Sequence, residues 1–120
     1  MKPGISNEPM VWGPFSGGGM LAATLAPIHI ILFGLLIPLG AIAVSYEGME
    51  SLVANPITRL YLLALIGGCF FHWAHRFRYI VIDLGVPHKL APIIAALSYG
   101  SATILSGWGA FVLFGPVAHT

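Results

Sequence analysis

The fold of this chain is decided by residues 60–83, which read LYLLALIGGCFFHWAHRFRYIVID. The stretch begins as an apolar run and ends with two histidines, two arginines and an aspartate. Ionisable side chains at membrane depth are costly, so they mark functional positions and must face protein, cofactor or water. The stretch therefore predicts a membrane helix that carries a polar site near one end.

The polar side chains of this helix are predicted to form one stripe. Residues three, four, seven and eleven positions apart share a face of an α-helix. Arg78 falls off that face, and we expect it to anchor the helix to headgroups or to a soluble partner. The stripe consists of His72, His75, Arg76, Tyr79 and Asp83.

The composition predicts an all-α membrane protein. The chain is 58% hydrophobic and 8% charged, whereas soluble domains carry roughly a quarter charged residues. No Asp, Glu, Lys or Arg occurs between Pro9 and Tyr46 or from Leu90 to Thr120, and a crossing needs about 20 apolar residues. The dispersed basic residues argue against nucleic-acid binding.

We expect one membrane domain, residues 1–120, with three transmembrane helices. An N-terminal segment, 1–19, precedes helices at about 20–44, 57–82 and 90–114. The first apolar run begins too late and is too long for a removed signal peptide. The third helix is rich in Ser, Gly and Ala, which let membrane helices approach closely.

Local signals refine this layout. Asn55-Pro56 predicts a break before the second helix, with Pro56 in its first turn. Arg59, near the start of that helix, is expected to extend to the membrane interface. His29 lies deep in the first span, where it either bonds a neighbouring helix or ligates a cofactor.

The basic residues predict the orientation. Lys2 precedes the first helix, and Arg76, Arg78 and Lys89 surround the second loop. By the positive-inside tendency, the N-terminus and the second loop are cytoplasmic. Trp12 and Phe15 then lie at the same membrane face as the polar stripe, as interfacial aromatic residues or as walls of a pocket.

Three roles for the stripe stay open on spacing alone. A quinone pocket would use His75 as a proton carrier, Arg76 as a fixed cation and Trp12 as an aromatic wall. A b-type haem would take His72 as an axial ligand. A structural stripe would only anchor the helix. No nucleotide loop, metal cluster or nucleophile with its base is apparent, so an enzyme complete in one chain is not expected.

Several motifs resemble the hydrophobic D subunit of bacterial fumarate reductase. They are Glu8-Pro-x-x-Trp12-x-x-Phe15-x-x-Gly18-Gly19-Met20, Ala26-Pro27, Pro38-Leu39-Gly40, and His75-Arg76 followed by Asp83-Leu84. The resemblance covers most of the chain, and the N-terminal motif is fairly specific.

The resemblance implies an anchor in the bacterial inner membrane that pairs with the C subunit, the second hydrophobic anchor of the complex. It would dock the iron-sulfur B subunit and the flavoprotein A subunit at the cytoplasmic face. FAD and the iron-sulfur clusters would belong to those partners only, and the complex would oxidise menaquinol and reduce fumarate. Trp12, His75 and Arg76 match the positions of the menaquinol pocket.

His72 departs from the pattern of the fumarate reductase anchors. The spacing from His72 to Asp83 resembles the His-x10-Asp of succinate dehydrogenase anchors, where the histidine binds haem b. That similarity implies a possible haem ligated by His72, with the second ligand on the second anchor. A succinate dehydrogenase anchor and a purely structural anchor are therefore the alternatives.

Overall fold

The structure, a computed structural model, describes residues 8–116. Every regular element in that range is helical. Three helices are long and apolar enough to cross a membrane, at Trp12–Leu36, Pro56–Asp83 and His88–Phe114. The predicted all-α, three-span fold is confirmed. The elements are α1 (Glu8–Ile31), the π-helix η1 (Leu32–Leu36), α2 (Tyr46–Ala54), α3 (Pro56–Asp83), the 3₁₀-helix η2 (His88–Leu90) and α4 (Ala91–Phe114).

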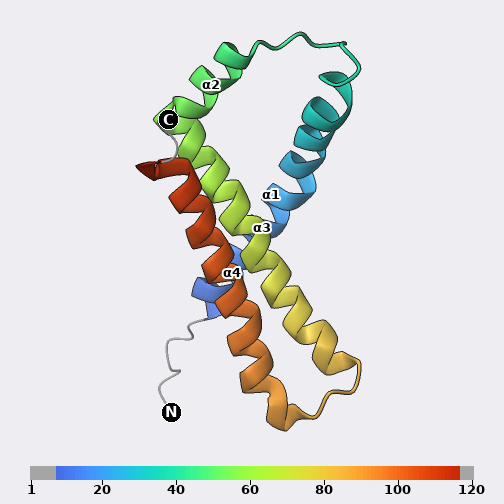
Figure 1. Ribbon diagram of the computed structural model, residues 1–120. Helices are drawn as coiled ribbons and strands as arrows, with labels where there is room; N and C mark the ends of the chain where they lie inside the picture. Colours follow the sequence, from blue (N-terminus) through green and yellow to red (C-terminus); the bar gives the residue numbers. More distant parts are fainter. Residues whose placement is uncertain (1–7, 117–120) are drawn as a thin grey trace.

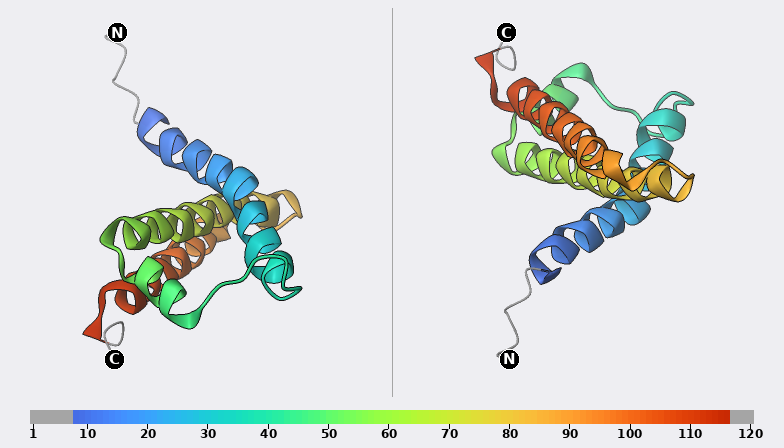
Figure 2. Two further views of the ribbon diagram at one scale, coloured as in Figure 1. Left: turned by 90° about the horizontal axis from the view of Figure 1, so that it is seen from above. Right: turned by 90° about the horizontal axis from the view of Figure 1, so that it is seen from below.

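The central helix is α3, which packs against both α1 and α4. Figure 1 shows α3 and α4 as an antiparallel hairpin and α1 crossing α3 obliquely, so that the described start of α1 lies on the side of the crossing that leads to the α3–α4 turn. In Figure 2, α3 lies between α4 and the N-terminal half of α1. This arrangement brings the start of α1 next to the polar end of α3.

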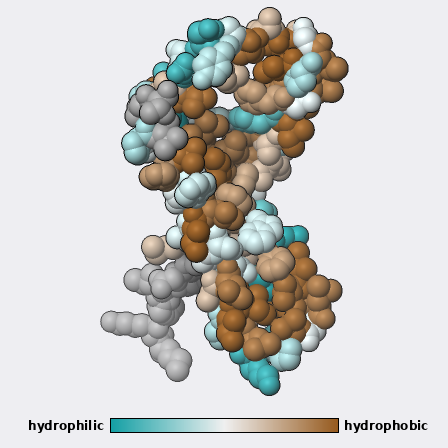
Figure 3. Space-filling model, in the orientation of Figure 1, coloured by the Kyte–Doolittle hydropathy of each residue, from teal (hydrophilic) through white to brown (hydrophobic). Residues whose placement is uncertain are grey.

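The surface is largely apolar, as expected of helices that cross a membrane. In Figure 3, hydrophobic residues cover most of the visible face, and strongly hydrophilic ones appear at the two ends and at a few places near the waist. Among the side chains that the structure describes, the buried apolar residues are Leu65, Ala74, Ala102 and Leu113. Packing between the spans therefore depends on small residues at the helix contacts rather than on a large core.

Glycines make the crossing of α1 and α3. A Cβ at Gly18 would collide with the backbone carbonyl of Gly68, and one at Gly68 would lie 3.3 Å from the Gly18 Cα. Because neither residue has a side chain, the two backbones meet directly, as small residues allow in membranes. Gly17, one position earlier, has nothing within 4 Å of its Cβ position.

The contact between α3 and α4 also uses small residues. Ala74 and Ala102 are completely buried, and Ser98 is 3% exposed. A Cβ at Gly109 would lie 3.4 Å from Ile66 Cγ2, which is ordinary contact distance. The predicted role of α4 as a packing surface is confirmed.

The second and third helices match the prediction within one residue at each end. Asn55 caps α3, its Oδ1 accepting a hydrogen bond of 2.8 Å from the Ile57 amide, and Pro56 occupies the first turn. Asn is a favoured N-cap and Pro a favoured first residue, so this start was readable in the sequence. At the other end, Gly85 has φ +97° and terminates the helix region, as a left-handed glycine commonly does.

The first helix differs from its predicted bounds of 20–44. It begins at Glu8 and therefore takes in most of the expected N-terminal segment; residues 1–7 lie outside the described range. Pro and Gly before Met20 suggested a loop. Pro9 falls in the first turn, where its missing N–H costs nothing, and Gly18 serves the contact with α3.

The first span also ends earlier than expected. The Ile37 amide donates to the Leu32 carbonyl, a bond of π-helix type, and Pro38 then offers no amide and clashes with the preceding turn. Gly40 follows with φ +72° and turns the chain. The helical ladder therefore stops before the predicted residue 44.

Two features of the first loop were not predicted. A short helix, α2, begins after Ser45, whose Oγ accepts a 3.0 Å bond from the Gly48 amide. Arg59 is 7% exposed, and its Nε donates to the Val53 carbonyl at 3.0 Å. The side chain of Arg59 therefore turns back toward α2, and its place relative to the membrane interface stays a prediction.

Candidate functional site

A cavity of about 450 Å³ lies where the start of α1 meets the end of α3. It contains the cation Arg76, the anion Asp83, the imidazole of His75 and aromatic rings from both helices. The expectation that the N-terminal aromatic residues and the polar stripe meet at one end is confirmed. The lining residues are Trp12, Phe15, His75, Arg76, Tyr79, Ile80 and Asp83.

His75 is the centre of an aromatic cluster. Its ring centroid is 5.9 Å from that of Trp12, 4.3 Å from that of Phe15 and 5.0 Å from that of Tyr79. The residue is only 8% exposed, although it faces the cavity. Packing on several sides fixes the plane of the imidazole.

The third span supplies a hydrogen bond to this imidazole. The hydroxyl of Tyr99, on α4, lies 2.7 Å from His75 Nδ1. This partner was not predicted, because no spacing rule connects a tyrosine on one helix with a histidine on another. Only the antiparallel packing of α3 and α4 reveals the pair.

A second cavity, of about 400 Å³, adjoins the first at His75 and Phe15. Arg78 lines this cavity and is partly buried, and its Cζ lies 5.2 Å from the Tyr79 ring centroid. Its Nε is buried without a partner among the described residues. The expectation that Arg78 points away from the stripe is wrong, because it shares this cavity with His75 and lies beside Tyr79. Its role as an anchor to headgroups or a soluble partner stays a prediction. The lining residues are Met10, Pro14, Phe15, Phe71, His75, Arg78 and Tyr99.

His72 sits toward the crossing and packs against α1. Its Nδ1 donates a 3.0 Å hydrogen bond to the Phe15 carbonyl, and the two rings stack with centroids 4.6 Å apart. A Cβ at Gly19 would lie 2.6 Å from His72 Cε1. Because a carbonyl only accepts, the Nδ1 proton is fixed and the Nε2 lone pair of the neutral ring is left free.

His29 bonds a neighbouring helix, as one of its two expected roles requires. Its Nδ1 donates to the Leu25 carbonyl at 2.7 Å, and its Nε2 lies 3.3 Å from the hydroxyl of Tyr61 on α3. The ring also stacks near Phe33 and Tyr61. Both ring nitrogens are therefore engaged within this chain.

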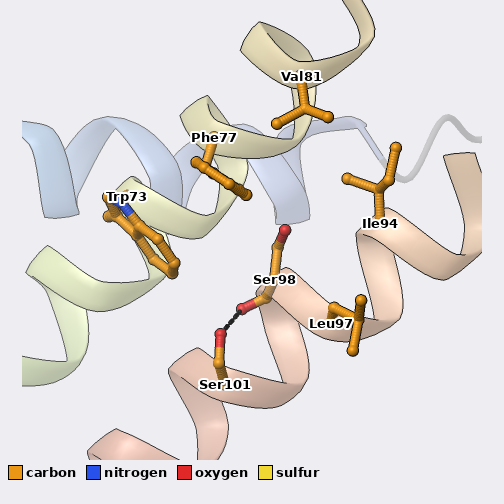
Figure 4. A pocket seen from close by; sticks show the side chains of 7 residues that line it. All are labelled: Trp73, Phe77, Val81, Ile94, Leu97, Ser98 and Ser101. Atoms are coloured by element: carbon orange, nitrogen blue, oxygen red, sulfur yellow. Dashed lines mark hydrogen bonds between the residues drawn. The ribbon is translucent and has the colours of Figure 1, made fainter. Parts of the chain in front are cut away.

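A third cavity, of about 280 Å³, lies between α3 and α4. Figure 4 shows aromatic and aliphatic side chains of both helices around it, with the Ser101 hydroxyl bonded to the Ser98 carbonyl. That bond is 2.9 Å long. The lining is almost entirely apolar, so this space lacks the charged groups that distinguish the first two cavities. Its residues are Trp73, Phe77, Val81, Ile94, Leu97, Ser98 and Ser101.

Comparison with known proteins identifies the family. The family model for the fumarate reductase D subunit matches residues 2–114. The fumarate reductase D subunit of Mycobacterium tuberculosis is 43% identical over 108 residues, which cover 86% of each chain. That of Vibrio cholerae is 34% identical over 116 residues, covering 94% of this chain and 88% of its own. The resemblance read from the motifs is confirmed, and the chain belongs to the family of fumarate reductase D subunits as a multi-pass membrane anchor.

Proposed function

We propose that this chain forms part of a menaquinol oxidation site of a fumarate reductase, with Trp12, His75 and Arg76 around the quinol headgroup. The observation that carries the proposal is the first cavity, which gathers these three side chains from two helices. Its volume of about 450 Å³ falls within the range of small-molecule sites, about 300–1,000 Å³. The apolar flanks of the bundle suit a lipid-soluble substrate.

The three residues have distinct chemical roles in this proposal. His75 accepts a proton from a quinol hydroxyl, since imidazole exchanges protons near neutral pH. Arg76 keeps a positive charge beside the headgroup and favours anionic character on the substrate oxygens. Trp12, which is 55% exposed at the cavity, packs on the substrate ring.

The proposed place of the chain in the complex follows from the same end of the molecule. The iron-sulfur subunit would cover the cavity at the cytoplasmic face of the bacterial inner membrane and accept the electrons. The flavoprotein subunit would hold FAD and reduce fumarate, and the second hydrophobic anchor would pack against the exposed helix faces. Arg76, Arg78 and Lys89 at this end support the cytoplasmic assignment by the positive-inside tendency.

The experiment compares two electron donors in the assembled complex carrying His75→Gln or Arg76→Ala. In His75→Gln we expect quinol-linked fumarate reduction to fall by about 100-fold or more, a typical effect of removing an acid-base group. In Arg76→Ala we expect a fall of about 100-fold, because a charge that stabilises the anionic substrate oxygens is lost. Reduction of fumarate by an artificial dye, which bypasses the membrane site, should stay at the wild-type rate.

Lys89→Ala is the matched control, since it removes an exposed cation at the same end but outside the cavity. It should leave both activities unchanged. Normal quinol turnover in assembled His75→Gln and Arg76→Ala complexes would instead support a purely structural anchor and contradict the proposal.

A haem b ligated by His72 is the alternative that one observation favours. Axial histidines usually donate their other ring N–H to a carbonyl or carboxylate, and His72 Nδ1 donates in this way to Phe15. The second ligand would come from the second anchor, and the complex would then resemble a succinate dehydrogenase. A reduced-minus-oxidised spectrum of the purified complex decides, since a b-type band lost in His72→Gln would establish the ligand.

A further inference from the structure

The hydrogen bond between His75 and Tyr99 differs in kind from those of the other membrane histidines. His29 and His72 each donate Nδ1–H to a backbone carbonyl, which accepts only and so fixes the tautomer. The Tyr99 hydroxyl, 2.7 Å from His75 Nδ1, both donates and accepts. Of these three histidines, only His75 can make the same hydrogen bond in either tautomer, with Nδ1 donating to the Tyr99 hydroxyl in one and accepting from it in the other.

The position of the pair adds a route for protons. His75 lines both polar cavities, whereas Tyr99 lines only the second. Nε2 lies across the imidazole from the Tyr99 bond. The second cavity measures about 400 Å³ and also contains Arg78, so it has the room and the polar partners that buried water requires.

We propose that Tyr99 is a positioning and proton-relay residue that lets His75 change tautomer during quinol oxidation. This inference rests on the proposed function of the first cavity. Quinol presents a hydroxyl, which needs an acceptor at Nε2, and the quinone product presents a carbonyl, which needs a donor there. A fixed tautomer serves one of these states, while the Tyr99 hydroxyl allows His75 to serve both.

The relay conserves protons and electrons. One quinol O–H proton moves to His75 Nε2, the Nδ1 proton moves to the Tyr99 oxygen, and the Tyr99 hydroxyl proton moves to water in the second cavity. The second hydroxyl proton leaves to water or a base outside this chain, and the two electrons leave to the iron-sulfur partner. After the quinone departs, Nε2 releases its proton to water in the first cavity. The Tyr99 hydroxyl then donates its proton to Nδ1 and takes another proton from water in the second cavity.

The test is Tyr99→Phe in the assembled complex, with Tyr61→Phe as the matched control. Both changes remove a hydroxyl that contacts a membrane histidine, but the partner of Tyr61 is His29, whose tautomer is fixed. Tyr99→Phe should lower kcat with quinol by about tenfold or more, change KM by less than about twofold and raise the solvent deuterium isotope effect on kcat. Dye-linked activity should be unchanged, and Tyr61→Phe should match the wild type in all four measurements.

Two results would overturn the relay. The first is that Tyr99→Phe has the same kinetics as Tyr61→Phe. The second is that Tyr99→Phe raises KM but leaves the isotope effect unchanged, which is the result expected if Tyr99 only positions His75. If Tyr99→Phe fails to assemble, 3-fluorotyrosine at position 99 keeps the shape and makes the hydroxyl more acidic. Its kcat and isotope effect should both change, and wild-type values would refute the relay.

The outcome is separable from that of the proposed function. If His75→Gln abolishes quinol turnover while Tyr99→Phe keeps the wild-type kcat and isotope effect, the relay alone is wrong. If His75→Gln also leaves quinol turnover intact, the quinol site itself is wrong.

Discussion

Trp12 and Trp108 are both exposed tryptophans, yet they differ in what surrounds them. Trp12 is 55% exposed and Trp108 65% exposed. Trp12 makes edge contacts with Phe15 and His75 at the mouth of the first cavity, whereas Trp108 lies toward the other end of α4 beside Phe111. In the proposed quinol site, Trp12 would act on the bound headgroup rather than on the proton transfer.

Trp12→Ala should therefore raise the KM for quinol by roughly tenfold while kcat changes little, because uniform binding affects KM alone. Trp108→Ala is the control and should leave both constants at wild-type values. Steady-state kinetics of the assembled complex with a soluble quinol measure the difference. A lowered kcat with unchanged KM in Trp12→Ala would contradict the assignment.

The stripe on α3 was readable from the sequence because residues at helical spacing share a face whatever the neighbours are. His75, Arg76, Tyr79 and Asp83 do line one cavity. The surroundings of two other residues could not be predicted from this spacing, because they depend on which helices pack against α3. Arg78 is covered by neighbouring helices, and Tyr99 reaches His75 from α4.

At the scale of the helices, the crossing of α1 and α3 depends on one glycine contact. A Cβ at Gly18 meets the Gly68 backbone, which has no flexible atoms to yield, while one at Gly17 meets nothing within 4 Å. An added Cβ is therefore accommodated at Gly17 but collides with α3 at the neighbouring Gly18.

Gly18→Ala should destabilise the anchor by about 1–3 kcal/mol, the usual cost of overpacking, and lower the amount of assembled complex in the membrane. Gly17→Ala should be neutral or stabilising by up to about 1 kcal/mol, because Ala favours the helix. Thermal unfolding of the purified complex in mild detergent compares them. Equal stability of the two variants would show that the direct backbone contact is absent.

The helix ends explain why the prediction succeeded for two spans and failed for one. Asn55-Pro56 is a local start signal whose meaning does not depend on context. The glycines and prolines before Met20 have two meanings, loop or close helix contact, and only the position of Gly68 on α3 decides between them. The nine residues of α2 are too few for a periodic signal.

For the whole molecule, the arrangement predicts which loops share a side of the membrane. The start of α1 and the turn after α3 lie on one side of the crossing of α1 and α3, and α2 lies on the other (Figure 1). With Cys69→Ser as background, Lys89→Cys should react with an impermeant thiol reagent only from the cytoplasmic side. Glu47→Cys should react only from the outside. Labelling of intact cells and of inverted vesicles gives the answer, and the reverse pattern would contradict the proposed orientation.

Two polar side chains of α1 bond carbonyls of their own helix. The Thr24 hydroxyl donates to the Met20 carbonyl at 2.6 Å, and the His29 imidazole donates to the Leu25 carbonyl at 2.7 Å. As the nascent chain leaves the ribosome, α1 is thus able to hold these two donors in lipid before the spans that follow it have been translated. The following span carries His75, whose hydroxyl partner lies on the later helix α4, and Arg78, whose Nε has no partner among the described residues. This span therefore depends on neighbouring segments for its stable insertion.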